Sequence, residues 1–178
     1  MQGGKKLRYF IADTHFNHEN IIKYCNRPLK NTKEMNGYII EKWNSVVSSN
    51  DIVYHLGDVG FGNTEELKKL IESLNGTKIL VRGNHDLKRG INGWKEVGFT
   101  EVYKKKLMLE NLVLTHGPIE VEEDYINVFG HIHNKPLDER FNKDNHICVS
   151  CDVIDYTPIC INKWKRKEEI LVKLEQYK

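Results

Sequence analysis

Short apolar runs alternate with amphipathic segments through the first half of the chain. The apolar runs are rich in β-branched and aromatic residues, which favours buried strands at residues 7–12, 51–56 and 77–81. Apolar positions at three- and four-residue steps predict helices at residues 19–25 and 35–47. This alternation is typical of βα units, whose strands form a parallel sheet.

A third helix is predicted between the second and third of these strands. Asn63 and Glu66 have the spacing of a capping pair, which marks the start of a helix. An apolar stripe follows over residues 67–74, and the pair Asn75-Gly76 supplies a carboxyl-terminal stop. The start, the apolar face and the end of this helix can therefore all be read from the residues.

The second half of the chain has the pattern of a β-rich region. Short apolar or alternating runs predict five strands, at residues 99–103, 106–109, 112–115, 128–129 and 147–149. A basic helix over residues 162–176 is expected near the end of the chain. No repeat or linker marks a boundary, so we expect one domain over residues 1–178, with two sheets packed face to face and helices outside.

The composition is that of an ordinary globular protein. Of 178 residues, 39% are hydrophobic and 29% are charged, and 27 basic against 25 acidic side chains leave a formal net charge of +2. This near balance argues against a dedicated nucleic-acid coat or a polybasic membrane binder. A polar start of the chain and four cysteines interpreted as reduced thiols favour a cytoplasmic protein.

Histidine carries the candidate chemistry. Five segments that follow predicted strands combine histidine, aspartate or asparagine with glycine or threonine: Asp13-Thr14-His15, Gly57-Asp58, Gly83-Asn84-His85-Asp86, Thr115-His116-Gly117 and Gly130-His131-Ile132-His133. Loops at the carboxyl ends of strands in an α/β sheet converge on one crevice, so these segments can meet there. An extended chain would also point the rings of His131 and His133 the same way. Each segment alone is common, but five in this order argue against coincidence.

The ordered set resembles the signature of the calcineurin-like metallophosphoesterases. The resemblance covers residues 13–133, and the segments around His18 and Trp43-Asn44 are similar to the short members without a cap domain found in bacteria and their phages. It implies an α/β fold, a four-layer α-β-β-α sandwich of two mixed sheets flanked by helices. It also implies a hydrolase that cuts phosphate esters with two divalent metal ions.

The resemblance also implies a role for each residue of the set. Seven side chains are implied as metal ligands: Asp13, His15 and His133 for the first ion, Asn84, His116 and His131 for the second, and Asp58 as the bridge between them. His85 would bind no metal and would contact the phosphate or protonate the leaving oxygen as general acid. Its neighbour Asp86 is the candidate for orienting it.

This ligand set indicates which ions and which reaction to expect. Mixed carboxylate, amide and imidazole ligands suit manganese, iron, zinc or nickel better than magnesium or calcium, and manganese is our first choice. A bridging carboxylate lets two ions approach to about 3.5–4 Å, and a water between them can lose its proton and become the nucleophile. The expected reaction is hydrolysis of a phosphodiester or phosphomonoester in a small or nucleotide-like substrate.

Three further residues are candidates for contact with the substrate. His18 and Asn17 lie just before the first predicted helix, whose amino terminus would suit a phosphate. The alternative for His18 is a surface or capping role. Arg27 is expected either to clamp a phosphate with two hydrogen bonds or to form an exposed salt bridge. His55 lies inside a predicted strand and is expected to be a core residue.

Two other functions remain open at this point. A metal-dependent nuclease acting on DNA or RNA would need a basic groove with stacking aromatics, which Tyr103 with its neighbouring lysines or the final basic helix would have to supply. A non-catalytic protein-binding scaffold would have a degraded metal site, whereas here every expected ligand is present. Protein Ser/Thr phosphatases read G-D-x-V-D-R-G around the bridging aspartate, but residues 57–62 read GDVGFG, which argues against a phosphoprotein substrate.

Overall fold

The first of two mixed sheets carries most of the βα units. In the computed structural model, which describes residues 6–160, its five strands have the order β4-β3-β2-β1-β9. β1 to β4 are parallel and β9 is antiparallel to β1. The strands are β1 Arg8–Ile11, β2 Ile52–His55, β3 Thr77–Val81, β4 Glu101–Tyr103 and β9 Ile159–Cys160. Parallel pairing of β1, β2 and β3 brings their carboxyl ends to one edge of the sheet.

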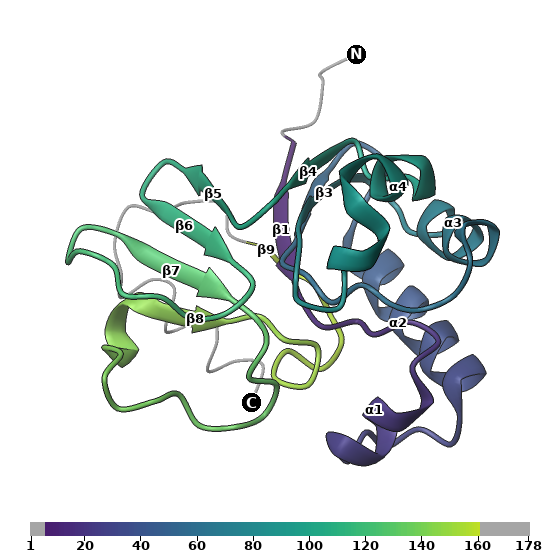
Figure 1. Cartoon of the computed structure of the whole chain (residues 1–178), viewed down its shortest axis with the longest axis horizontal. Helices are drawn as coiled ribbons and strands as arrows, with labels where there is room; N and C mark the ends of the chain where they lie inside the picture. Colours follow the sequence, from purple (N-terminus) through teal and green to yellow (C-terminus); the bar gives the residue numbers. More distant parts are fainter. Residues whose placement is uncertain (1–5, 161–178) are drawn as a thin grey trace.

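The second sheet has four strands in the order β5-β6-β7-β8 (Figure 1). β5 is antiparallel to β6, while β6, β7 and β8 are parallel. The strands are β5 Lys106–Leu109, β6 Leu112–Thr115, β7 Ile126–Phe129 and β8 His146–Cys148. Every residue of β6 and β7 is buried, which explains why both strands are nearly continuous apolar runs.

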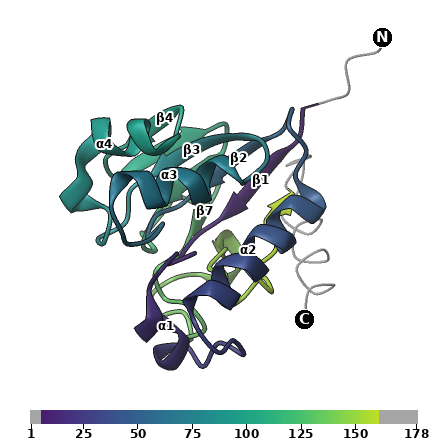
Figure 2. The same cartoon turned by 90° about the vertical axis from the view of Figure 1, so that its right-hand side faces the viewer.

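Helices lie along the first sheet on the side away from the second sheet (Figures 1 and 2). The helices are α1 Glu19–Tyr24, α2 Thr32–Val46, α3 Thr64–Glu72 and α4 Gly90–Val97, with short 3-10 turns η1 Leu87–Arg89 and η2 Lys143–Asn145. One hydrophobic core joins these layers, because Trp43 of α2, Phe10 of β1 and Val128 of β7 belong to the same buried cluster. The fold is therefore the expected one of two mixed sheets flanked by helices.

Most of the elements lie where the residue pattern predicts them. The strands at 77–81, 106–109 and 112–115 have the predicted bounds, and Asn63 and Glu66 form the capping box that starts α3. His55 is buried in β2, as expected of a core residue. The basic helix expected at 162–176 lies outside the described residues. Within residues 6–160, no helix has the length and apolar character needed to cross a membrane.

Two elements were not predicted from the sequence. α4 has only eight residues, two of them glycines, which lower helix propensity, and it buries only Trp94 and Val97. β9 has only two residues and pairs with β1 through Ile159 and Cys160, far along the chain from its partner. Tertiary packing rather than local pattern determines both elements.

Candidate metal centre

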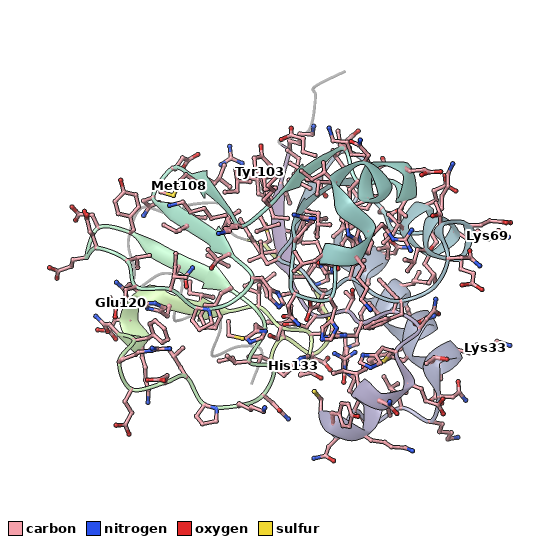
Figure 3. The ribbon with its side chains drawn as sticks, viewed as in Figure 1. Lys33, Lys69, Tyr103, Met108, Glu120 and His133 are labelled. Atoms are coloured by element: carbon pink, nitrogen blue, oxygen red, sulfur yellow. The ribbon has the colours of Figure 1, made fainter. Side chains whose placement is uncertain are left out.

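Five loops meet where the two sheets come together. They follow β1, β2 and β3 of the first sheet and β6 and β7 of the second, whose ends approach one another in Figure 1. Backbone bonds join neighbouring loops: the Asp13 N–H donates to Gly57 O at 3.0 Å, and the Gly130 N–H donates to His116 O at 2.8 Å. Figure 3 shows His133 near the middle of the molecule, with Lys33 and Lys69 at its periphery. The five candidate segments are thus brought together.

Asp13, His15 and His133 form a first donor group, whose ligand atoms all lie within 4.8 Å of one another. Asp13 and His15 are 0% and 1% exposed. Asp13 Oδ1 and His15 Nε2 are buried and have no hydrogen-bond partner within the described part of the chain. A buried polar atom without a partner costs about 1–3 kcal/mol, so a cation between these atoms accounts for an otherwise unfavourable arrangement.

Asp58, His116 and His131 form a second donor group of the same size. His116 Nε2 lies 3.0 Å from Asn84 Oδ1, 3.2 Å from His131 Nδ1 and 3.3 Å from Asp58 Oδ2. Asp58 Oδ2 is also 3.6 Å from His15 Nε2 of the first group. Asp58 is therefore the carboxylate that lies between the two groups, and its position suits a bridging ligand.

The backbone at these residues is unusual. Five of the seven candidate ligands have left-handed backbone conformations, with φ of 58° at Asp13, 49° at His15, 56° at Asp58, 71° at His131 and 52° at His133. Such conformations cost about 1–3 kcal/mol each outside glycine and cluster at functional sites. His131 and His133 do not point the same way, as was predicted for an extended chain, because both have left-handed backbones and their rings join different donor groups.

Close approach of the loops requires glycine at two positions. A side chain at Gly83 would collide with the Asp58 carboxylate, and one at Gly130 would collide with Asp13. The missing Cβ lets the backbone run against each carboxylate.

The two donor groups differ in their electrostatics. Burial lowers the pKa of His15 to about 2, so its ring is neutral at physiological pH. Burial also opposes protonation of His116, but the hydrogen bond to Asp58 and the charges of Asp13 and Asp58 outweigh it and raise the pKa of His116 to about 9. Burial would raise the pKa of Asp58, yet its bonds and charge contacts with His116 lower it to about 2.

His85 lies at the exposed edge of the second group. Its backbone N–H donates to Asp58 Oδ1 at 2.9 Å, and its ring Nε2 is 3.9 Å from Asp58 Oδ2. The side chain is 43% exposed, which leaves the ring accessible to a substrate. This position suits a proton donor beside the metal ligands.

Asp86 is placed differently from its predicted role. Its carboxylate accepts the backbone N–H groups of Gly83 at 2.7 Å, Asp58 at 2.8 Å and Val59 at 3.1 Å. The side chain is almost fully buried. Asp86 thus fixes the loops that carry Asp58 and Asn84 rather than the imidazole of His85.

The three candidate substrate residues also separate in the structure. His18 faces the centre: its Nδ1 is 3.2 Å from His15 Nδ1, and it makes no side-chain cap to α1. The Asn17 side chain donates to Phe61 O and accepts from Asn36, which ties the Phe61 loop to α2. Asn17 is therefore engaged in holding the loop.

Arg27 fits neither of its two sequence interpretations. Its side chain is buried, and it donates to the Asp152 carboxylate at 2.8 and 3.1 Å and to the carbonyl oxygens of Asp13 and Thr14 at 2.7 and 3.0 Å. With these acceptors the guanidinium stabilises the β1 loop. It does not form an exposed salt bridge, and it is not presented to a phosphate.

A sixth loop, after β8, was missed from the sequence. Ser150 Oγ donates to Asp13 Oδ2 at 2.5 Å, and Asp152 Oδ2 is 2.7 Å from His133 Nδ1. Both residues follow the predicted strand at 147–149, so the rule that found the other five loops would have found this one. All four cysteines are free thiols, as expected, and Cys25 lies near His133 and Asp152.

Comparison with known proteins agrees with this geometry. Two mixed sheets with clustered metal-ligating side chains between their strand ends are the arrangement of a metal-dependent phosphoesterase. The chain belongs to the calcineurin-like phosphoesterase superfamily, whose domain description matches residues 8–150. Members of this superfamily are metal-dependent phosphoesterases, so the resemblance inferred from the motifs is confirmed.

The relatives found do not name a substrate. An uncharacterized protein of Methanocaldococcus jannaschii is 41% identical over 162 residues, which cover 86% of each chain. The gene 66 protein of Mycobacterium phage L5 is 32% identical over 81 residues, 44% of this chain and 39% of that protein. The crystal structure of a protein of unknown function from Aquifex aeolicus covers 96% of this chain and all of its own, with a TM-score of 0.69 and 27% identity.

Proposed function

We propose that this protein hydrolyses phosphodiesters or phosphomonoesters of a small or nucleotide-like substrate with two divalent ions held by the two donor groups. One observation carries the proposal: buried Asp13 Oδ1 and His15 Nε2 lack hydrogen-bond partners in the described residues and lie beside a carboxylate, Asp58, shared with a second group. The mixed oxygen and nitrogen donors suit manganese, iron, zinc or nickel, with manganese as our first choice.

The residues of the centre have separate tasks in this reaction. Two bound ions would supply an activated water and offset charge on the phosphoryl oxygens. Asp58 lies between the two groups and would bind both ions. Asp86 fixes the backbone of the Asp58 and Gly83 loops. His85, exposed beside Asp58, donates a proton to the leaving oxygen. His18 lies on the same open side and is available to contact the phosphoryl group.

Turnover of bis-p-nitrophenyl phosphate and of p-nitrophenyl phosphate tests the proposal. Protein stripped with a chelator should be inactive, and added manganese should restore cleavage of at least one of the two esters. Elemental analysis of the purified protein identifies the ions it carries. If neither ester is cleaved with any divalent metal, the protein-binding scaffold replaces the hydrolase as the best interpretation.

The nuclease alternative has less support from the geometry. Tyr103, which was to line a basic groove with its neighbouring lysines, lies well away from His133 in Figure 3. A salt-dependent degradation of DNA or RNA by the metal-loaded protein would restore this alternative.

A further inference from the structure

A pocket of about 630 Å³ opens beside His85. Its lining comes from the loop after β2, the loop after β3, η1 and α4, and includes Phe61, Asn84, His85, Lys88, Arg89 and Trp94. Because Asn84 contacts His116 of the second donor group and His85 lies next to it, the pocket is continuous with the metal centre.

The wall of the pocket nearest the centre is aromatic. Phe61 is 37% exposed, and its ring centroid lies 5.5 Å from the ring of His85 and 4.5 Å from that of His18. Both backbone polar groups of Phe61 are hydrogen-bonded. Its N–H donates to Phe16 O, and its carbonyl oxygen accepts from the Asn17 side chain. The Phe61 ring is therefore exposed on a fixed backbone beside the expected proton donor, and a planar group can stack on it.

Another part of the pocket lining is positively charged. Lys88 is exposed and has no ion pair or hydrogen bond with another residue of 6–160. Among the described residues, Arg89 donates only to neutral acceptors, Thr64 Oγ1 at 2.8 Å and Gly62 O at 2.7 Å, so no carboxylate of this part of the chain balances its charge. Glu96 is the one acidic residue of the lining, which leaves two cations against one anion.

We propose that this pocket receives the leaving group of the substrate, and that this leaving group carries an aromatic ring and a further negative charge, as a nucleotide does. The inference rests on the proposed function. To protonate the leaving oxygen, His85 must lie within hydrogen-bond reach of it, which places the departing group on the pocket side. The ring then stacks on Phe61 and the added anion faces Lys88.

The reaction balances at this position. Water gives up one proton to solvent as its oxygen forms the new bond to phosphorus, and the bond from phosphorus to the leaving oxygen breaks with its electron pair on that oxygen. The proton of His85 passes to the leaving oxygen, so the group departs as a neutral hydroxyl compound apart from its added anion. His85 regains a proton from solvent through its exposed face.

Two substrates of matched size test the charge preference. 4-Carboxyphenyl phosphate and 4-carbamoylphenyl phosphate differ in one negative charge on the same ring, and released phosphate gives kcat/KM for each. In Lys88→Ala the ratio of carboxylate to amide substrate should fall by about two- to fivefold relative to wild type, the range of an exposed ion pair. Lys88→Glu should lower it further, and the difference should shrink at high ionic strength.

Lys95→Ala is the matched control, because Lys95 is an exposed lysine of α4 outside the pocket lining. It should leave the ratio unchanged. Phe61→Leu should lower kcat/KM for phenyl phosphate relative to cyclohexyl phosphate by about two- to tenfold, the range of an aromatic pair. If the wild-type protein cleaves these esters but Lys88→Glu has the same ratio of carboxylate to amide substrate, the inference is overturned and the proposed function still stands.

A binding measurement separates the pocket from catalysis. Adenosine monophosphate titrated into the metal-free protein should shift the backbone amide signals of residues 61–64 and 84–96, and Lys88→Glu should weaken this binding. Absence of all ester cleavage in the wild type would overturn the proposed function, while these shifts would still report on the pocket. Shifts that map to another surface would overturn the pocket assignment itself.

Discussion

The two donor groups are built from similar side chains but sit in different surroundings. Asp13 and His15 of the first group are buried. In the second group His116 is also buried, but His131 is exposed, as is the adjoining Asn84. The first group has an outer layer, in which Ser150 bonds to Asp13 and Asp152 bonds to His133. In the second group, the ring of His116 bonds through Nδ1 to a backbone carbonyl, Leu56 O.

From this difference we expect the two donor groups to have different roles. Hydrogen bonds to metal-ligating groups fix their orientation and raise metal affinity, so we expect the first group to bind its ion more tightly. The second group opens toward His85 and the adjoining pocket, so we expect the substrate to bind on this side.

Asp58→Ala should have the largest effect, because it removes the side chain that the two groups share. We expect loss of most bound metal and a fall in turnover of more than about 10⁴-fold, since the ions supply several kcal/mol of transition-state stabilisation. Elemental analysis and ester hydrolysis measure the two effects. Asp124→Ala, an exposed aspartate before β7, is the control and should change neither. Two tightly retained ions in Asp58→Ala would refute the bridging position.

His85→Ala should separate catalysis from metal binding. We expect unchanged metal content and a fall in kcat of about 10²–10⁴-fold, the contribution of a general acid. The loss should be greater for phenyl phosphate than for p-nitrophenyl phosphate, because p-nitrophenolate leaves without needing a proton. A parallel loss of metal would make His85 a ligand of the second group. An equal loss with both esters would argue against proton donation.

Asp152→Asn should weaken only the first group. The variant keeps the shape of the side chain but removes the charge that faces His133 and Arg27, and we expect the tighter ion to lose affinity by about 10–100-fold. Competition with a chelator measures this for each ion. Asp155→Asn is the control. Asp155 lies in the same loop as Asp152, but it is at the surface, where it pairs with Lys42. Equal weakening of both ions would show that the two groups are not independent.

Asp152 also carries a buried ion pair with Arg27, so the folding of its variant needs a separate check. Breaking a buried pair costs about 3–5 kcal/mol when one charge is left without a partner. Thermal unfolding of the metal-free variant measures this cost. A folded variant with unchanged affinity for both ions would remove Asp152 from the centre.

The sequence predicted the residues that lie in the centre better than the contacts that hold them there. The five segments that hold the seven candidate ligands were found because each follows a predicted strand, which is a local feature of the sequence. The resemblance to the family then implied which of their side chains bind metal. The roles of Arg27 and Asp86 were not predicted, because their partners are backbone atoms. Arg27 donates to Asp13 O and Thr14 O, and the Asp86 carboxylate accepts from the N–H groups of Asp58 and Val59. Ser150 and Asp152, which bond to Asp13 and His133 of the first group, were missed for another reason. Both follow the predicted strand at 147–149, but the resemblance to the family covers only residues 13–133. Residue type and order predict which groups meet, but only packing determines what holds them.

Electrostatic differences within the centre also depend on packing, and the pH dependence of folding tests them. In the metal-free protein, His116 has a folded pKa of about 9 against about 6.5 when unfolded, so the folded state binds the extra proton between these values. Stability from His116 is fully present below pH 6.5 and is lost as the pH rises toward 9. His15, with its pKa lowered to about 2, and His55, lowered to about 3, act in the opposite direction and destabilise the fold as the pH falls below 6.5.

Metal-free protein should therefore be most stable near the unfolded histidine pKa of about 6.5, and each group should change the free energy of unfolding by at most about 1.4 kcal/mol per pH unit. Thermal unfolding in chelator from pH 5 to 9 measures both sides of this maximum. His116→Asn should flatten the alkaline side and leave the acid side unchanged, because the acid side arises from histidines that stay neutral when buried. If His116→Asn flattened the acid side instead, the second donor group would not hold its proton in the folded state, and the electrostatic contrast between the two groups would be wrong.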